Sequence, residues 1–209
     1  MAPDLLSLDV GPVLRGLDMI GLAIFAASGA LTAARKRLDV IAAGFFALVT
    51  ATGGGTMRDL LIGAPVFWMH DAVPILLCLI VGFGGWLIPL RWWPHRALEW
   101  LDAGGLAAYA VYGAGKALHY GIPPLPAAAM GIVTACMGGI IRDVVAGVPS
   151  ILLRHELYVT AALLAAGLYV GLTVAGMAAP WPMLIAVSAG FLLRVAAIRW
   201  GLAMPPHRG

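Results

Sequence analysis

Seven charged side chains lie inside long apolar stretches of the chain. A charge at the centre of a lipid-embedded helix costs roughly 2.5–3.5 kcal/mol on insertion scales, so such residues usually pair with one another and face a water-filled cavity. Side chains of this type in this setting serve the passage of ions or solutes rather than the making and breaking of bonds. They are Asp18, Arg58, Asp59, Asp102, Lys116, Arg142 and Asp143.

The distance of each charge from the end of its apolar stretch gives its depth in the membrane, and charges at the same depth can form ion pairs. Asp18 and Arg58 each lie about five residues from the same membrane face, or some 8 Å deep at about 1.5 Å per residue. We therefore predict an ion pair between Asp18 and Arg58. The same reasoning at the opposite face predicts a pair between Asp102 and Arg142. Arg58 and Asp59 are neighbours along a helix and are not expected to pair. The predicted pairs either border a path for ions or only lock two halves of the molecule together.

Glycines interrupt the second and fifth apolar stretches just before their Arg-Asp dipeptides. Each glycine costs roughly 1 kcal/mol in a helix interior relative to alanine, so these runs predict a break or a sharp kink. The backbone groups freed there need water, an ion or another helix, which favours a water-filled path at the midplane. The alternative is close helix packing through small residues. The predicted break comprises Gly53, Gly54, Gly55, Gly138 and Gly139.

Other polar side chains accompany these charges and glycines. Lys116, near the outer end of the fourth stretch, either snorkels to the interface or enters an outer vestibule as a cation-repelling gate. Tyr109 and Tyr112 precede it by one or two turns, and they line the same face or pack as core aromatics. Threonine hydroxyls beside the glycines either line the path or bond back to the preceding turn. The threonines are Thr50, Thr52, Thr56 and Thr134.

The composition of the chain is typical of an integral membrane protein. The chain has 209 residues, of which 62% are hydrophobic and 11% charged, and its mean hydropathy is +0.95. Soluble domains are about 45–50% apolar and about 25% charged. We therefore expect an all-α integral membrane protein and no nucleic-acid partner, and we interpret the net charge of +3 as a marker of orientation.

Seven apolar stretches are long enough to cross a bilayer, which takes about 20 residues. The connections between them are too short for a soluble domain, so residues 1–209 are predicted to form a single transmembrane domain. The predicted spans are Val13–Ala33, Asp39–Gly63, Ala72–Leu90, Leu98–His119, Leu125–Gly147, Glu156–Ala175 and Trp181–Gly201.

The chain repeats itself at an offset of 84 residues. Leu17-Asp18 recurs as Leu101-Asp102, and Arg58-Asp59 recurs as Arg142-Asp143. Each repeat holds three spans, so the second copy enters the membrane from the opposite side. We therefore predict two inverted three-helix repeats, residues 13–90 and 98–175, followed by an extra helix at 181–201. Many transport proteins have this organisation, with the functional site near the midplane.

Basic residues at the span ends predict the orientation. Because positive loops face the cytoplasm, we place the C-terminus in the cytoplasm and the N-terminus outside, with lipid as the surrounding partner. Tryptophans at span ends are typical of an interfacial belt. The basic residues assigned to the cytoplasmic side are Arg35, Lys36, Arg37, Arg91, Arg96, Arg154, Arg194, Arg199 and Arg208.

Signatures of enzymes and metal sites are missing from the sequence. It has no HExxH, GxSxG or phosphate-binding loop. Its five histidines, His70, His95, His119, His155 and His207, are scattered without ligand spacing, and Cys78 and Cys136 lie apart in apolar runs. We expect no catalytic residue and no cofactor.

Two segments carry a resemblance to a known family. TATGGGTMRDLLIGAPVFW and TACMGGIIRDVVAGVPSILLRHELY resemble the paired signatures of the trimeric intracellular cation (TRIC) channel family, prokaryotic branch, also labelled a duplicated glycine transporter domain family. The resemblance implies a homotrimer in a bacterial-type inner (plasma) membrane, with an hourglass pore in each subunit. Potassium and other monovalent cations would pass, with K⁺ or Na⁺ bound only transiently. It further implies kinks at the five glycines and makes Lys116 a candidate for a basic gating residue. Met137 departs from the pattern, because it replaces the first glycine of the second motif.

Two functions remain open from the sequence. The first is a passive channel for monovalent cations such as potassium. The alternative is a secondary transporter of a small amino acid such as glycine, because inverted repeats and broken helices serve transporters equally well. Asp59 and Asp143 are the candidate proton carriers for the alternative.

Overall fold

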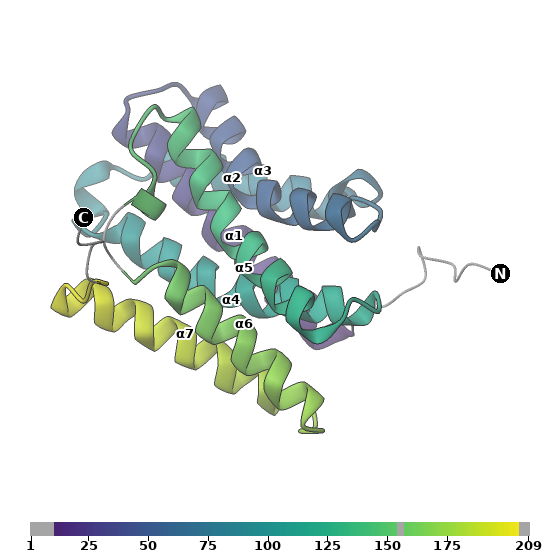
Figure 1. Ribbon diagram of the computed structural model, residues 1–209. Coiled ribbons are helices and arrows are strands. Elements are labelled where there is room, and N and C mark those ends of the chain that lie inside the picture. The colour runs from purple at the N-terminus through teal and green to yellow at the C-terminus, as the bar shows by residue number, and fades with distance from the viewer. Residues whose placement is uncertain (1–10, 154–156, 205–209) are drawn as a thin grey trace.

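Seven α-helices and three short 3₁₀ helices make up the computed structural model, which describes residues 11–153 and 157–204 (Figure 1). The α-helices are α1 (Pro12–Arg35), α2 (Val40–Leu61), α3 (Ala72–Leu87), α4 (Ala97–His119), α5 (Pro124–Val145), α6 (Val159–Val174) and α7 (Trp181–Trp200). The 3₁₀ helices are η1 (Phe67–Met69), η2 (Leu90–Trp92) and η3 (Ile151–Leu153). Each predicted span corresponds to one α-helix. Arg154, His155, Glu156, His207 and Arg208 lie outside the described residues.

Hydropathy separates these helices into groups. Among the described residues, α1, α2, α5 and α7 are long and apolar enough to cross a membrane by length and composition. The apolar helices α3 and α6 are shorter, with 16 residues each. α4 carries Glu99, Asp102 and Lys116, and most of its residues are buried, because it packs against α1, α5, α6 and α7. The charged residues of α4 are therefore shielded by the helices around it.

Local signals explain where these helices begin and end. The side chain of Asp39 accepts a hydrogen bond of 2.8 Å from the Ala42 N–H at the start of α2, as an N-cap residue does. Gly63 and Gly147, one position after the caps of α2 and α5, have φ values of +67° and +62°. Glycine adopts this left-handed conformation without strain, so these repeat-equivalent residues end both helices in the same way.

The core of the fold is built from α1, α2, α4 and α5. α3 packs against α1 and α2, and α6 packs against α4 and α5, as repeat-equivalent helices should. α7 lies beside α6 and also contacts α4, at the edge of the bundle opposite α3 (Figure 1). The extra helix thus packs mainly against the second repeat.

Contacts between α1 and α4 reveal the inverted symmetry. A Cβ atom at Gly21 would lie 2.5 Å from the Tyr109 ring, and one at Gly105 would lie 2.9 Å from the Phe25 ring. The two contacts are equivalent, because adding the 84-residue offset to Gly21 and Phe25 gives Gly105 and Tyr109. Since the later residue of α1 contacts the earlier residue of α4, the two helices run antiparallel. The predicted fold class, two inverted three-helix repeats with a seventh helix, is confirmed.

Candidate functional site

α2 and α5 cross at the glycines that precede their Arg-Asp dipeptides. A Cβ atom at Gly54 would overlap the carbonyl oxygen of Thr134, and one at Gly138 would overlap the carbonyl oxygen of Thr50. The two contacts are equivalent: adding the 84-residue repeat offset to Gly54 and Thr50 gives Gly138 and Thr134. The pseudo-two-fold axis that relates the repeats therefore passes through the crossing. The two helices meet there backbone to backbone, an approach that small residues allow.

Neither helix is interrupted at these glycines, so the predicted break is not formed, while the predicted kink stays a prediction. α2 is continuous over Val40–Leu61 and α5 over Pro124–Val145. Close packing, the alternative considered above, outweighs the cost of roughly 1 kcal/mol per glycine. Gly53 takes no part in the backbone contact, because its Cβ would meet the side chain of Ile141 at 2.6 Å. The equivalent position in α5 accordingly accommodates Met137.

The last glycine of each motif makes room for charged groups. A Cβ atom at Gly139 would lie 3.0 Å from Asp102 Oδ1 and 3.0 Å from the Tyr158 hydroxyl. A Cβ atom at Gly55 would lie 2.7 Å from the Phe67 ring and 3.5 Å from Arg58 Nη2. A cluster of charged side chains therefore sits beside the crossing at each end.

The first charge cluster consists of Asp18, Arg58, Asp59 and Lys116, and all four side chains are buried. Asp59 is its centre. The Oδ1 atom of Asp59 accepts hydrogen bonds of 2.8 Å from Arg58 Nε and of 2.8 Å from Lys116 Nζ. Charge-assisted bonds of this length are the strong ones in proteins.

The predicted pair of Asp18 with Arg58 is not formed among the described residues, because Arg58 bonds Asp59 instead. The guanidinium carbon of Arg58 lies 4.8 Å from the centre of the Tyr112 ring, so Arg58 contacts Asp59 and the face of Tyr112. The expectation that Arg58 and Asp59 would not pair is also wrong, since the long arginine side chain folds back along its own helix.

Lys116 does not snorkel to the interface. It is 6% exposed, and its ammonium group lies 6.0 Å from the centre of the Phe67 ring and 5.9 Å from that of Tyr120. A buried ammonium needs a carboxylate partner, which Asp59 supplies. The two aromatic faces add cation–π attraction.

The second charge cluster consists of Asp102, Arg142, Asp143 and Arg194, which are also buried. Arg142 is its centre. Nη1 of Arg142 lies 3.2 Å from Asp102 Oδ1, and Nη2 lies 2.7 Å from Asp143 Oδ1. Nη1 also donates a hydrogen bond to the Ser28 hydroxyl. The predicted pair of Asp102 with Arg142 is thus present, and the neighbouring Asp143 joins it.

Each Arg-Asp dipeptide also fastens the loop that follows its helix. Asp59 Oδ2 accepts a hydrogen bond of 3.1 Å from the Phe67 N–H, and Asp143 Oδ2 accepts one of 2.8 Å from the Ile151 N–H. The two bonds are related by the repeat offset. Both aspartates are therefore fully engaged, which explains why each dipeptide is followed by a similar Gly-x-Pro turn.

The threonine hydroxyls separate into two groups. Thr52, Thr56 and Thr134 bond back to carbonyl oxygens of the preceding turn, at 2.8, 2.8 and 2.6 Å. Thr52 and Thr56 also line an open hollow beside Ile141 of α5, together with Gly53, so they lie on a different face of α2 from the Thr50 and Gly54 contacts. Thr50 is 1% exposed, and its hydroxyl has no hydrogen-bond partner among the described residues.

Tyr109 lies in the core between the two clusters. Its ring packs against Phe25 and Tyr112, with ring centres 5.3 and 6.1 Å apart. Its hydroxyl donates a long hydrogen bond of 3.5 Å to the Ala51 carbonyl, next to the crossing. Tyr109 is therefore a core aromatic that also brings a polar atom to the crossing.

Three residues of the second cluster were missed by the sequence reasoning. Arg194 was counted as a cytoplasmic loop charge, yet it is fully buried, with its guanidinium carbon 5.2 Å from the centre of the Tyr158 ring. Its place about seven residues before the end of the seventh span puts it roughly 10 Å deep, so the depth argument could have found it. Nothing in the sequence marked Ser28 or Tyr158.

The two clusters lie on opposite sides of the crossing. The centre of the crossing lies midway between its two contacts, at Thr52 of α2 and Cys136 of α5, and Arg58 and Arg142 each follow it by six residues. At about 1.5 Å per residue each arginine is about 9 Å from the centre along the antiparallel pair, so the two are about 18 Å apart along the helices. Between and within the clusters are buried polar atoms without a hydrogen-bond partner in the described part of the chain: Arg58 Nη1, Thr50 Oγ1 and Asp102 Oδ2.

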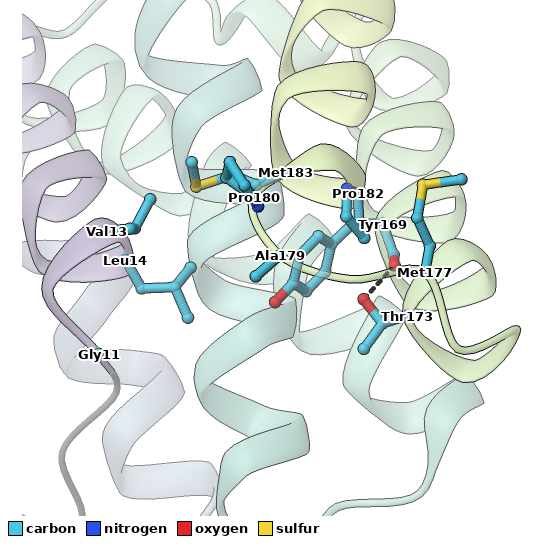
Figure 2. Close-up of a pocket in the computed structure, with 10 residues that line it drawn as sticks. All are labelled: Gly11, Val13, Leu14, Tyr169, Thr173, Met177, Ala179, Pro180, Pro182 and Met183. Atoms are coloured by element: carbon cyan, nitrogen blue, oxygen red, sulfur yellow. Dashed lines mark hydrogen bonds between the residues drawn. The ribbon is translucent and has the colours of Figure 1, made fainter.

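Two cavities differ in their relation to these clusters. A pocket of about 300 Å³ lies between the start of α1, the end of α6 and the start of α7, and Figure 2 shows mainly apolar side chains around it, with Thr173 bonded to the Tyr169 carbonyl. None of its lining residues belongs to a charge cluster. A hollow of about 50 Å³ instead reaches the second cluster and is lined by Glu99, Arg142 and Asp143 among others.

The described residues include no group of three or more His, Cys, Asp or Glu side chains that could hold a metal ion. Carboxylates of both clusters are instead neutralised by arginine or lysine. The chemistry that this arrangement supports is electrostatic: two compensated polar regions joined across a tight helix crossing.

Comparisons with known proteins identify relatives along most of the chain. The sequence profile of a family described as "Glycine transporter" matches residues 15–89 and 99–174. The inner membrane protein YadS of Escherichia coli K12, a UPF0126 protein, is 37% identical over 199 residues, which cover 90% of this chain and 93% of YadS.

Solved structures agree with these sequence matches. The TRIC trimeric intracellular cation channel orthologue of Rhodobacter sphaeroides is 42% identical with a TM-score of 0.86, and the match covers 92% of this chain and 100% of that one. A prokaryotic TRIC channel crystallised in 0.5 M KCl is 27% identical with a TM-score of 0.84, over 92% and 98% of the two chains. Neither the profile nor these structures describe an enzyme. The chain belongs to the prokaryotic branch of the TRIC family, whose sequence profile carries the description glycine transporter.

Proposed function

We propose that the protein is a cation channel of the bacterial inner membrane. Its membership of a family whose solved members are described as cation channels supports this function. The name of its relative YadS supports the location. We further propose a homotrimer surrounded by lipid, with the N-terminus outside and the C-terminus in the cytoplasm. Residues 1–209 would form one transmembrane domain that needs no cofactor and binds no nucleic acid.

We propose that ions cross each subunit along the interface of α1, α2, α4 and α5. The observation that carries this path is the series of buried polar atoms without protein partners, Arg58 Nη1, Thr50 Oγ1 and Asp102 Oδ2. Buried groups of this kind normally find water or an ion. They follow one another from the first cluster through the crossing to the second cluster.

An hourglass shape follows from the same geometry. The crossing of Gly54 with Thr134 and of Gly138 with Thr50 is the narrowest point, because backbone meets backbone there. We therefore infer that the structure represents a closed path, which conducts when α2 and α5 move apart. Because the carboxylates in both clusters are already neutralised, a monovalent cation such as K⁺ would pass without a deep trap.

The site residues fall into three groups in this proposal. Gly54, Gly138, Thr50 and Thr134 form the constriction, with Tyr109 beside it. The two charge clusters border the path on either side, with Tyr112 next to the first cluster. Thr52 and Thr56 lie outside the path. Their hydroxyls are satisfied by their own helix.

Recording from planar bilayers that contain the purified protein tests the function. We expect discrete single-channel current steps in KCl. The alternative, a small-amino-acid transporter, is not favoured, because the similar structures are described as channels. An absence of steps combined with saturable, proton- or sodium-coupled glycine uptake into liposomes would establish the alternative.

A matched pair of threonine variants tests the path. Thr50→Val removes the unpartnered hydroxyl at the crossing, and we expect a smaller unitary current because a dehydrated cation or its water loses a polar contact. Thr52→Val makes the same chemical change two residues away, where the hydroxyl is already bonded to the Leu48 carbonyl and the residue lines the hollow beside Ile141, and should leave the current unchanged. Equal effects of the two variants would contradict the proposed route.

A further inference from the structure

α7 lies outside the inverted repeat, yet it contributes to one of the two charge clusters. Arg194 is 0% exposed, and its guanidinium carbon lies 5.2 Å from the centre of the Tyr158 ring. It is also within electrostatic reach of Asp102. A charged side chain buried this deeply on a helix that would otherwise only cover the bundle calls for a specific role.

Comparison of the two clusters indicates that role. Each contains two aspartates and the arginine of its Arg-Asp dipeptide. The second cation of the first cluster is Lys116 of α4, but the repeat-equivalent position in α1 is Thr32, whose hydroxyl bonds to the Ser28 carbonyl at 2.9 Å. The repeat therefore supplies no second cation to the second cluster, and Arg194 of α7 takes that place.

The charge of Arg194 acts next to an entrance. The hollow of about 50 Å³ beside Arg142 and Asp143 connects the second cluster with the surface, where Glu99 also lines it. The formal charges of Asp102, Asp143, Arg142 and Arg194 sum to zero. Removal of Arg194 makes this mouth more negative by one charge.

We propose that Arg194 is a positioning residue that sets the cation concentration at the mouth of the second cluster, an inference that rests on the proposed channel function. It acts through its field on Asp102 and Asp143 and does not contact the ion itself. The seventh helix thereby sets the charge at the mouth beside the second cluster. The mouth beside the first cluster does not depend on α7, because its second cation, Lys116, belongs to the repeat. The two mouths differ in the origin of their charge although they are related by symmetry.

The expected effect can be worked out from Coulomb's law. A unit charge about 7 Å from a hydrated cation changes the local cation concentration about threefold in the dielectric of water. The effect depends on salt, because the Debye length falls from about 10 Å at 0.1 M to about 3 Å at 1 M. A purely structural role of Arg194 would show no such salt dependence.

Single-channel current–voltage curves of four variants test the proposal. Arg194→Gln and Arg194→Met remove the charge, Arg194→Lys keeps it, and Arg199→Gln removes an exposed charge from the end of the same helix. In about 0.1 M KCl, where screening reduces the threefold effect, we expect the two neutral variants to rectify, with an about 1.5-fold larger current for cations that enter at the second cluster. In about 1 M KCl this asymmetry should disappear. Arg194→Lys and Arg199→Gln should behave as the unmodified protein.

The outcomes separate this proposal from the proposed function. An unmodified protein that carries no current contradicts the channel function, and with it the role of Arg194. If the unmodified protein conducts and the neutral variants rectify no more than it does, only the role of Arg194 is overturned. Size-exclusion chromatography in detergent supplies the structural readout. Failure of both neutral variants to assemble, while Arg194→Lys assembles, also overturns the proposal, because the charge is then needed for the fold.

Discussion

Replacement of Gly54 by alanine tests the backbone contact at the helix crossing. The new methyl group would overlap the Thr134 carbonyl oxygen, so α2 and α5 must move apart or distort. Overpacking of this kind typically costs 1–3 kcal/mol. Alanine also stabilises the helix by about 1 kcal/mol relative to glycine. A second Gly→Ala variant with the same gain is needed as a control, so that this gain can be subtracted from the measured change in stability.

The neighbouring Gly53→Ala variant is that control. It gains the same propensity in the same helix, but its methyl group meets Cδ1 of Ile141, the movable end of a side chain. The equivalent position in the second repeat already holds Met137. The difference between the two variants therefore isolates the backbone overlap, at about 2 kcal/mol.

Thermal unfolding in detergent, followed by tryptophan fluorescence, measures this difference. For a chain of this length, about 1 kcal/mol corresponds to about 2–4 °C in Tm, so Gly54→Ala should melt about 4–8 °C below Gly53→Ala. Gly138→Ala should behave as Gly54→Ala, because its methyl group would overlap the Thr50 carbonyl oxygen. Equal melting temperatures for the Gly53 and Gly54 variants would refute the close approach of α2 and α5.

Three further predictions concern the charge clusters and the loop beside them. Arg142→Met leaves two buried carboxylates without their main partner and should destabilise the protein by about 3–5 kcal/mol in the same unfolding assay; a loss below 1 kcal/mol would contradict the central place of Arg142. Lys116→Met should cost less than Asp59→Asn, because Asp59 bonds two cations and the Phe67 N–H; the reverse order of melting temperatures would show that Asp59 is not the centre of its cluster. Trp68 Nε1 donates a 2.8 Å hydrogen bond to Thr56 Oγ1, so a double-mutant cycle with Trp68→Phe and Thr56→Val should give a coupling of about 1 kcal/mol, and additive effects would argue against that bond.

The sequence predicted the large-scale organisation well because the relevant signals are local. Apolar stretches located all seven helices, and the offset between the two Arg-Asp dipeptides predicted the inverted symmetry seen in the Gly21 and Gly105 contacts. Burial of the charged residues also followed from their position in the spans. None of these conclusions needed knowledge of which helix lies beside which.

The errors at the site arise where helix rotation and packing decide the outcome. Depth along a span cannot tell which neighbouring side chain a charge contacts, and Arg58 bonds Asp59 and lies over the Tyr112 ring. The cost of glycine in an isolated helix suggested a break, whereas the partner backbone at Thr134 makes an unbroken helix favourable. Only the packed structure contains that information.

Arg194 shows a different kind of error. Its depth was available from the sequence, but the bias of positive charges towards one side was used to assign it to a loop. The structure places it in the second cluster, against Tyr158. A basic residue well inside a span deserves the same test for burial as an acidic one.

The reversal potential in a KCl gradient tests the central claim most directly. With a tenfold gradient across a planar bilayer, an ideally cation-selective path reverses at about 59 mV, with the sign of the potassium equilibrium potential. We predict single-channel currents that reverse close to this value. A reversal near zero, or one of the opposite sign, would contradict a cation path between the two charge clusters.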